Sequence, residues 1–215
     1  MNPKPNPSAS LDFIHQFIPA ADGNVPGSPT LLLLHGTGGN EDDLLELGRS
    51  LAPAANLLSP RGKILENGMP RFFRRFTEGV FDEVDLIFRT HELADFAAAA
   101  ATAYGFSTES LTAVGYSNGA NIAASLLLLH PGLLSRAVLL RAMVPLVPEK
   151  PPALDGTKVF LASGTGDPIL PIENARRLAG MLRMARAEVD FHEIQAGHQL
   201  TSAELHDARA WLAAS

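Results

Sequence analysis

A serine with neighbours suited to nucleophilic catalysis lies near the middle of the chain. The segment Gly115–Gly119 reads Gly-Tyr-Ser-Asn-Gly and matches the pattern G-x-S-x-G. It separates a predicted strand, Leu111–Tyr116, from a predicted helix, Asn118–His130. A serine in such a strand-to-helix turn exposes its hydroxyl on a strained backbone, and flanking glycines avoid steric clashes there. The helix start directs free N–H groups at the same place. We therefore predict that Ser117 is a nucleophile.

A nucleophilic serine needs a base and an acid that orients the base. Asp167 follows the predicted strand Lys158–Ser163, and His198 follows the predicted strand Glu188–Ile194. The order serine, acid, histidine, with each residue after a strand, is one of the known orders for such a triad. Other late candidates lie before or inside predicted strands: Asp155, Asp190 and His192. We predict Asp167 and His198 as the partners of Ser117.

A third requirement is a pair of N–H donors for the negative charge that develops on a carbonyl oxygen. One should be the backbone N–H of Asn118, the residue after the nucleophile. The other should come from the glycine-rich loop His35–Gly39, where the backbone N–H of Thr37 is available. We therefore predict an oxyanion hole formed by Thr37 and Asn118.

Competing motifs fail in this sequence. The loop at residues 35–39 is no phosphate-binding P-loop, because no Gly-Lys pair follows it, and Glu41 stands where a dinucleotide-binding loop needs glycine. The pair His192-Glu193 does not extend to H-E-x-x-H, because the fifth residue is Ala196. The seven histidines are otherwise scattered. We expect neither a catalytic metal nor a cofactor.

The segment Arg71–Phe76 is basic and aromatic, and it follows a predicted strand. It could overhang the carboxyl edge of the sheet, where ligands bind in this class of protein. Its substrate-contact candidates are Phe72, Phe73, Arg74 and Phe76, and an arginine of the segment could hold a substrate carboxylate. The alternative, a solvated basic turn whose phenylalanines reach the core, stays open.

Predicted strands and helices alternate along the chain. The strands are expected at Leu11–Ile18, Thr30–Leu34, Asn56–Ser59, Leu111–Tyr116, Arg136–Leu140, Lys158–Ser163 and Glu188–Ile194. The helices are expected from Glu41 to about Ala52 and at Asp85–Tyr104, Asn118–His130, Glu173–Arg186 and Ser202–Ala214. This alternation predicts an α/β fold with a mostly parallel central sheet and helices on both faces. We expect one domain over residues 11–215, without a cap domain.

Composition narrows the class of protein. The chain has 215 residues, 46% of them hydrophobic and 19% charged, which is ordinary for a globular enzyme. Its net charge of −6 argues against nucleic acid as a partner, and without cysteine it can form neither disulfides nor a thiolate nucleophile. Residues 1–10 contain three prolines and are expected to be a disordered lead-in. With no apolar leader and no membrane-length segment, a cytoplasmic protein without membrane insertion is expected.

Taken together, several motifs resemble the phospholipase/carboxylesterase family of α/β-hydrolases. They are Leu-Leu-His-Gly-Thr-Gly-Gly-Asn, Ser-Pro-Arg-Gly, Gly-Tyr-Ser-Asn-Gly-Ala-Asn, Gly-Thr-Gly-Asp-Pro and Gly-His-Gln-Leu. This compact, lidless group also contains acyl-protein thioesterases. The Phe-Phe-Arg-Arg segment is most similar to its small bacterial carboxylesterase branch, which includes hydrolases linked to hydroquinone stress. The resemblance runs from about Leu11 to Trp211.

The resemblance implies an α/β-hydrolase fold with Ser117, Asp167 and His198 as triad, and with the N–H groups of Thr37 and Asn118 as oxyanion donors. It implies a carboxylesterase acting on small-molecule esters, which we expect to be short-chain or small aromatic ones. Thioesterase or lysophospholipase activity on longer acyl chains is the alternative. A non-catalytic ligand-binding protein with the same fold is the hypothesis outside the enzymes. A homodimer is left open.

Overall fold

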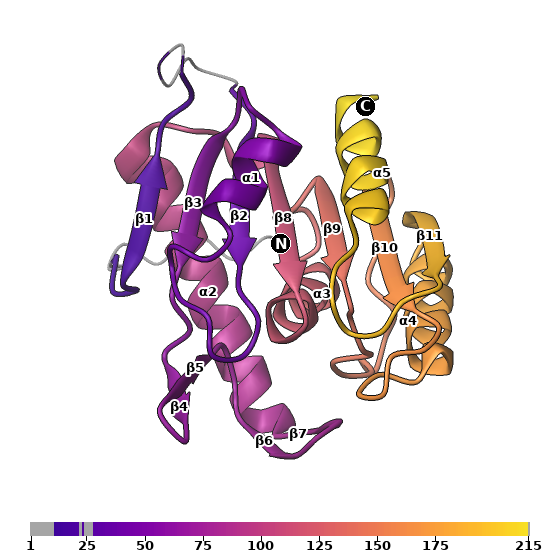
Figure 1. Cartoon of the computed structure of the whole chain (residues 1–215). Coiled ribbons are helices and arrows are strands. Elements are labelled where there is room, and N and C mark those ends of the chain that lie inside the picture. Colours follow the sequence, from indigo (N-terminus) through magenta and orange to yellow (C-terminus); the bar gives the residue numbers. More distant parts are fainter. Residues whose placement is uncertain (1–10, 22, 24–27, 215) are drawn as a thin grey trace.

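The computed structural model describes residues 11–21, 23 and 28–214, so the expected lead-in at residues 1–10 lies outside the described residues. Its main feature is a seven-stranded sheet with the strand order β1-β3-β2-β8-β9-β10-β11 (Figure 1). The strands are β1 (His15–Ile18), β2 (Thr30–Leu34), β3 (Asn56–Pro60), β8 (Leu111–Tyr116), β9 (Arg136–Leu140), β10 (Lys158–Gly164) and β11 (Glu188–Ile194). Only β1 pairs antiparallel, with β3, and the other neighbours pair parallel.

Helices cover both faces of this sheet. Those of the chain's described part are α1 (Leu45–Leu51), α2 (Glu83–Tyr104), α3 (Asn118–Leu129), α4 (Ile172–Met184) and α5 (Ser202–Ala213), with a short 3-10 helix at Thr108–Ser110. α1 and α5 lie together on one face, whereas α2, α3 and α4 lie on the other (Figure 1). The predicted α/β architecture is therefore confirmed as an α/β-hydrolase fold.

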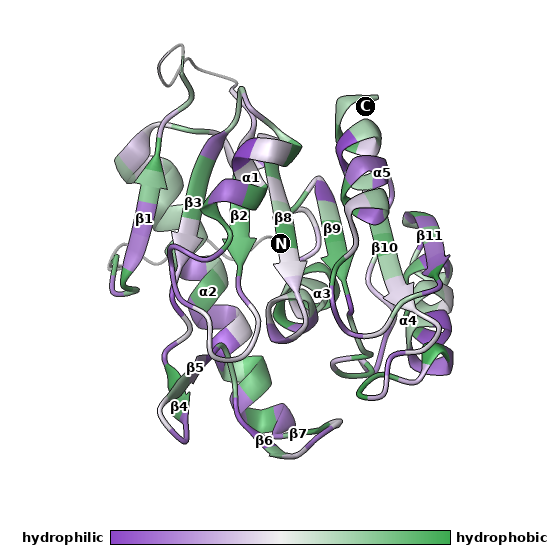
Figure 2. Cartoon of the chain, viewed as in Figure 1, coloured by the Kyte–Doolittle hydropathy of each residue, from purple (hydrophilic) through white to green (hydrophobic). Residues whose placement is uncertain are grey.

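The central strands are apolar because both of their faces are buried. In β2, Leu32 and Leu34 belong to the core under α2, α3 and α4, whereas Leu31 and Leu33 belong to the core under α1 and α5. Figure 2 shows β2 mostly green and β9 green beyond its purple first residue, whereas the edge strands β1 and β11 carry more purple, hydrophilic residues. The uninterrupted leucine run thus follows from a position in the middle of the sheet.

The connection between β3 and α2 is more ordered than the loop expected from sequence. It forms two small hairpins, β4 (Ile64–Glu66) with β5 (Met69–Arg71) and β6 (Arg75–Thr77) with β7 (Val80–Phe81). Both lie beyond the edge of the sheet to which the arrowheads of β2, β8, β9 and β10 point (Figure 1). Along the described chain no separate cap domain covers this edge, and the hairpins are its main additions.

Some boundaries differ from the expected ones. β1 is limited to His15–Ile18, the residues that pair with β3. α1 begins at Leu45 and not at Glu41, because the Asn40 side chain accepts the N–H of Asp42 at 2.7 Å and stabilises a turn instead of a helix. α2 begins earlier, at Glu83, with Asp82 as its N-cap. Among the described residues, none of the helices is long and apolar enough to cross a membrane.

Candidate active site

Ser117 lies in a strained turn between β8 and α3. Its φ of 52° and ψ of −115° lie outside the favoured regions for a residue with a side chain. The turn also depends on its two glycines. A Cβ at Gly119 would lie 1.9 Å from the carbonyl oxygen of Leu34, and one at Gly115 would lie 2.6 Å from the backbone of Ala120. The G-x-S-x-G pattern therefore meets a steric requirement of this turn.

The loops after β10 and β11 start side by side. The last residue pair of these parallel strands is Gly164 with Ile194, and the N–H of Gly166 then donates to the carbonyl of Ala196 at 3.0 Å. A Cβ at Gly164 would lie 2.4 Å from that same carbonyl oxygen, so only glycine allows the loops to approach this closely. This contact brings the residues that follow, Asp167 and His198, to one place.

The three residues predicted as a triad are within hydrogen-bonding distance. Nδ1 of His198 lies 2.7 Å from Oδ2 of Asp167, and Nε2 lies 3.1 Å from Oγ of Ser117. Because an ionised carboxylate only accepts hydrogen bonds, Nδ1 carries the proton that is donated to Asp167. In the neutral ring, Nε2 is then free to accept from the hydroxyl of Ser117, as the base of a triad must.

Local hydrogen bonds fix the acid. The side chain of Asp167 is fully buried, and its second oxygen, Oδ1, accepts the N–H groups of Ile169 at 2.8 Å and Leu170 at 3.1 Å. The ring of Tyr116 lies beside the base, with its centroid 5.5 Å from that of His198, and its hydroxyl donates to the carbonyl of His198 at 3.1 Å. Asp167 and His198 are thus held by hydrogen bonds to the backbone as well as by their contact with each other.

The loop that carries Thr37 is braced by a buried histidine. Nδ1 of His35 donates to the carbonyl of Gly36 at 2.7 Å, and its Nε2 accepts the N–H of Gly62 at 2.9 Å. Burial lowers the pKa of His35, which keeps the ring neutral as these two contacts require. Asn118 is the first residue of α3, so its N–H has no partner within the helix. The two proposed oxyanion donors therefore belong to segments held in place by other contacts: Thr37 to the loop that His35 braces, and Asn118 to the first turn of α3.

A residue that the sequence analysis did not single out, Arg141, holds the loop that carries His198. Arg141 follows β9, is fully buried and has a φ of 60°. Its Nε donates to the carbonyl of Gly197 at 3.1 Å, and its Nη2 donates to that of Gln199 at 2.7 Å. One guanidinium thus binds the backbone immediately before and after His198. No motif marks Arg141, because its partners are more than 50 residues away in sequence.

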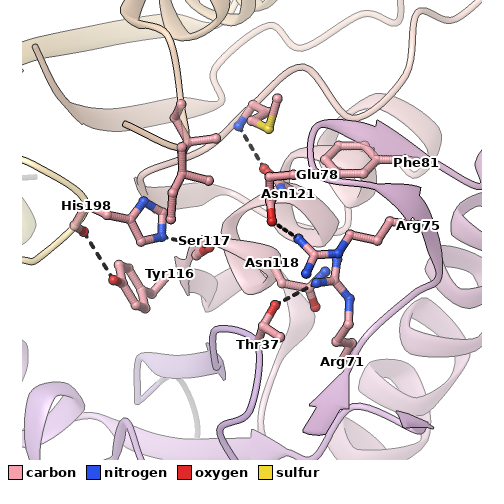
Figure 3. Close-up of a pocket in the computed structure, with 13 residues that line it drawn as sticks. Thr37, Arg71, Arg75, Glu78, Phe81, Tyr116, Ser117, Asn118, Asn121 and His198 are labelled. Carbon is pink, nitrogen blue, oxygen red and sulfur yellow. Dashed lines mark hydrogen bonds and ion pairs between the residues drawn. The ribbon is translucent and has the colours of Figure 1, made fainter. Parts of the chain in front are cut away.

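Ser117 opens into a cavity of about 240 Å³ (Figure 3). In this view Ser117 lies between His198 on one side and Arg71 and Arg75 on the other. The remaining lining residues come from the hairpin β6–β7, the end of β8, the start of α3 and the loops after β2, β9 and β10: Thr37, Glu78, Phe81, Tyr116, Asn118, Asn121, Met143, Ile169 and Leu170. The cavity combines charged residues with an apolar part.

The four substrate-contact candidates of the basic segment do not line this cavity. Phe72 and Phe73 are buried in the core, against His35 and Phe81 respectively. The side chain of Arg74 is 59% exposed and pairs with Asp82, and Phe76 is 76% exposed. The cavity is lined instead by Arg71, which precedes Phe72, and by Arg75, which lies between Arg74 and Phe76. The sequence alone could not show which of the arginines at positions 71, 74 and 75 face the cavity.

The fold and the arrangement around Ser117 place the protein among the α/β-hydrolases. Comparison with family models shows that the chain belongs to the phospholipase/carboxylesterase family, whose model matches residues 18–215. The resemblance expected from the motifs is thereby confirmed.

Individual relatives agree with this membership. The chain is 51% identical over 181 residues to the putative hydrolase MhqD of Bacillus subtilis (strain 168). The aligned part covers 84% of this chain and 90% of MhqD. The crystal structure of the Bacillus cereus carboxylesterase superposes with a TM-score of 0.90 at 48% identity, covering 94% of each chain. The protein Atu2452 of Agrobacterium tumefaciens (strain C58), of unknown function, is 37% identical with a TM-score of 0.86, covering 94% of this chain and 96% of that one.

Proposed function

We propose that the protein is a serine carboxylesterase that hydrolyses short-chain or small aromatic esters through an acyl-enzyme on Ser117. The observation that carries the proposal is the continuous hydrogen-bonded series from Asp167 through His198 to Ser117, which ends at a cavity. Family membership supports ester hydrolysis in general, and the geometry supports the residues that would perform it.

The reaction would proceed in two halves. Nε2 of His198 takes the proton of Ser117 as Oγ attacks the ester carbonyl, and the N–H groups of Thr37 and Asn118 stabilise the oxyanion. The imidazolium then gives its proton to the departing alcohol, which leaves the acyl group on Ser117. Water, activated by the same imidazole, releases the acid and restores the free serine. Asp167 keeps Nδ1 protonated and stabilises the imidazolium in both halves.

The size of the cavity supports a small substrate. Its volume of about 240 Å³ lies below the roughly 300–1,000 Å³ that is typical of small-molecule sites. The apolar lining residues are few: Phe81, Met143, Ile169 and Leu170. A long acyl chain gains about 0.8 kcal/mol for each buried methylene only while the surface that covers it continues.

A chain-length series of 4-nitrophenyl esters tests the proposal. We expect kcat/KM to be highest for acetyl to butyryl esters and to fall by octanoyl. A value that keeps rising through dodecanoyl would favour a thioesterase or lysophospholipase. Absence of turnover above background for every ester would instead indicate a binding protein.

A further inference from the structure

The wall of the cavity beside Ser117 contains a buried cation. Arg71, at the end of β5, is 2% exposed and lines the cavity. Its backbone is held tightly, because a Cβ at Gly62 would lie 2.3 Å from the carbonyl carbon of Arg71. A buried guanidinium is costly unless hydrogen bonds and an opposite charge compensate it. The partners of Arg71 therefore show whether its buried charge is fully compensated within the protein.

The compensation of Arg71 is partial. The nearest carboxylate, Glu66, binds Arg75 at 3.0 Å and 2.8 Å and reaches Nη1 of Arg71 only at 3.4 Å. The other acceptors of Arg71 are uncharged: Oγ1 of Thr37 at 2.8 Å and the carbonyl of Phe73 at 3.3 Å. Its Nη2 has no hydrogen-bond partner among the described residues. Burial, with repulsion from Arg75, lowers the pKa of Arg71, although an arginine stays protonated.

A second unused donor belongs to Asn118, a residue that also lines the cavity. Asn118 is 2% exposed, and its Oδ1 accepts the N–H of Phe72 at 2.8 Å, which fixes the orientation of the amide. Its Nδ2 is buried and has no hydrogen-bond partner in the part of the chain that the structure describes. Buried donors are rarely left without an acceptor in native proteins. The donor therefore fits a ligand that brings an acceptor.

The charges of the cavity leave Arg71 as the cation available to a ligand. Among the described lining residues, the arginines and carboxylates are Arg71, Arg75 and Glu78. Glu78 forms an ion pair with Arg75, so the negative charge at the rim is already engaged. Glu66 does not line the cavity. Of the two arginines that line the cavity, Arg71 is therefore the one whose charge is less engaged by carboxylates.

On the basis of the proposed ester hydrolysis, we propose that Arg71 and Asn118 form a subsite for a carboxylate carried by the ester substrate. The preferred substrates are then half-esters of small dicarboxylic acids, or esters whose alcohol bears a carboxylate. The carboxylate stays unchanged, and water still cleaves only the ester bond, giving acid and alcohol. The apolar lining residues would contact the short hydrocarbon part between the two groups.

Two matched substrate pairs test the subsite on the wild-type protein. Monomethyl succinate is compared with methyl 4-methylpentanoate, its neutral analogue of similar shape, and 3-acetoxybenzoate is compared with 3-acetoxybenzamide. We expect the charged member to have a roughly ten- to hundredfold higher kcat/KM in at least one pair, as one or two charge-assisted hydrogen bonds provide. The pair that shows the preference also tells whether the carboxylate belongs to the acid or to the alcohol.

Variants of Arg71 separate the subsite from a general effect of charge. Arg71→Met should remove the preference mainly by raising KM for the charged substrate, and Arg71→Lys should keep part of it. The matched control is Arg74→Met, which removes the same charge three residues away from a side chain outside the cavity. This control should keep the full preference.

Binding to the Ser117→Ala variant gives a readout that does not need turnover. Calorimetry with monomethyl succinate should give a dissociation constant at least about tenfold lower than with methyl 4-methylpentanoate, and adding Arg71→Met should abolish the difference. If the wild type hydrolyses both members of each pair equally well, the subsite is wrong while the esterase proposal stands. If the binding preference is present but no ester is hydrolysed, the esterase proposal fails and the carboxylate site remains.

Discussion

Arg141 and Glu204 form a fully buried ion pair behind the proposed catalytic base. Nη1 and Nη2 of Arg141 lie 2.6 Å and 2.9 Å from the two carboxylate oxygens of Glu204, and both side chains are 0% exposed. Glu204 also belongs to the capping box with Thr201 that begins α5. The pair thus connects the end of β9 to α5, across the loop that carries His198.

We predict that Arg141→Met lowers both stability and kcat. Removal of one partner from a buried ion pair costs about 3–5 kcal/mol, because the other charge stays buried without compensation. The double variant Arg141→Met/Glu204→Gln removes that charge and should regain much of the melting temperature. Its kcat should stay low, since the carbonyls of Gly197 and Gln199 still lack their donor. Recovery of kcat together with stability would show that Arg141 does not position His198.

The control for this experiment is Arg176→Met. Arg176 forms a bidentate pair with Glu193 at the surface, where ion pairs contribute little to stability. Its hydrogen bonds go to Glu173 and Glu193 and not to the loop that carries His198, so we expect nearly unchanged melting temperature and kcat.

The oxyanion hole can be tested at Thr37 through variants that separate side chain from backbone. Thr37→Pro removes the N–H and should lower kcat by roughly a hundredfold or more, as loss of one oxyanion donor does. Thr37→Val keeps the N–H but removes the acceptor of Arg71, so a smaller, severalfold loss is expected. Thr37→Ser keeps both and should retain most activity. Equal losses in folded Thr37→Pro and Thr37→Val variants would assign the role to the hydroxyl.

The buried His35 predicts a dependence of stability on pH. Its pKa is lowered by burial in the folded protein and returns to about 6.5 in the unfolded chain. As the pH falls below about 6.5, the unfolded state binds a proton first, so the free energy of unfolding decreases until the lower folded pKa is reached. Protonation would also remove the acceptor that Nε2 offers to Gly62.

Urea unfolding at pH 7.5 and pH 5.5 measures this effect. His35→Gln offers an amide oxygen near the position of Nε2 without a titrating group, so its stability should change less between the two pH values than that of the wild type. His130, whose pKa burial also lowers, is present in both proteins and cancels in the comparison. An identical pH dependence of wild type and variant would contradict the prediction.

Much of the fold could be predicted because the apolar runs in the sequence correspond to strands that are buried on both faces in the centre of the sheet. The leucine run of β2 is apolar on both faces, and the glycines around Ser117 and at the end of β10 mark places where backbones nearly touch. The predicted triad required only that loops after parallel strands share one edge of the sheet. Each of these signals can be recognised within its own short segment of the sequence, although the segments themselves lie far apart.

The remaining features depend on contacts between distant segments. Arg141 and Glu204 are 63 residues apart, and nothing near either residue shows that its charge is buried. In the segment Arg71–Phe76, alternation alone could not decide whether phenylalanines or arginines face the cavity. The answer depends on the hairpins β4–β5 and β6–β7, which are too short to leave a periodic signal.

The pH dependence of turnover follows from the proposed base. Protonated His198 cannot accept the proton of Ser117, so kcat/KM should fall at acidic pH. A chelator such as EDTA should leave the rate unchanged, because the proposed mechanism uses no metal. Inactivation by EDTA that added zinc reverses would contradict this mechanism.

The central claim is that Ser117 is the nucleophile, and covalent labelling tests it most directly. A fluorophosphonate reacts with a serine only where a base and an oxyanion hole activate it. Intact-protein mass spectrometry should show a single adduct on the wild type and on the control variant Ser110→Ala, and peptide mapping should place it on Ser117. Ser117→Ala should stay unlabelled, keep its fold and lose ester turnover by several orders of magnitude. Labelling or substantial turnover in folded Ser117→Ala would contradict the account.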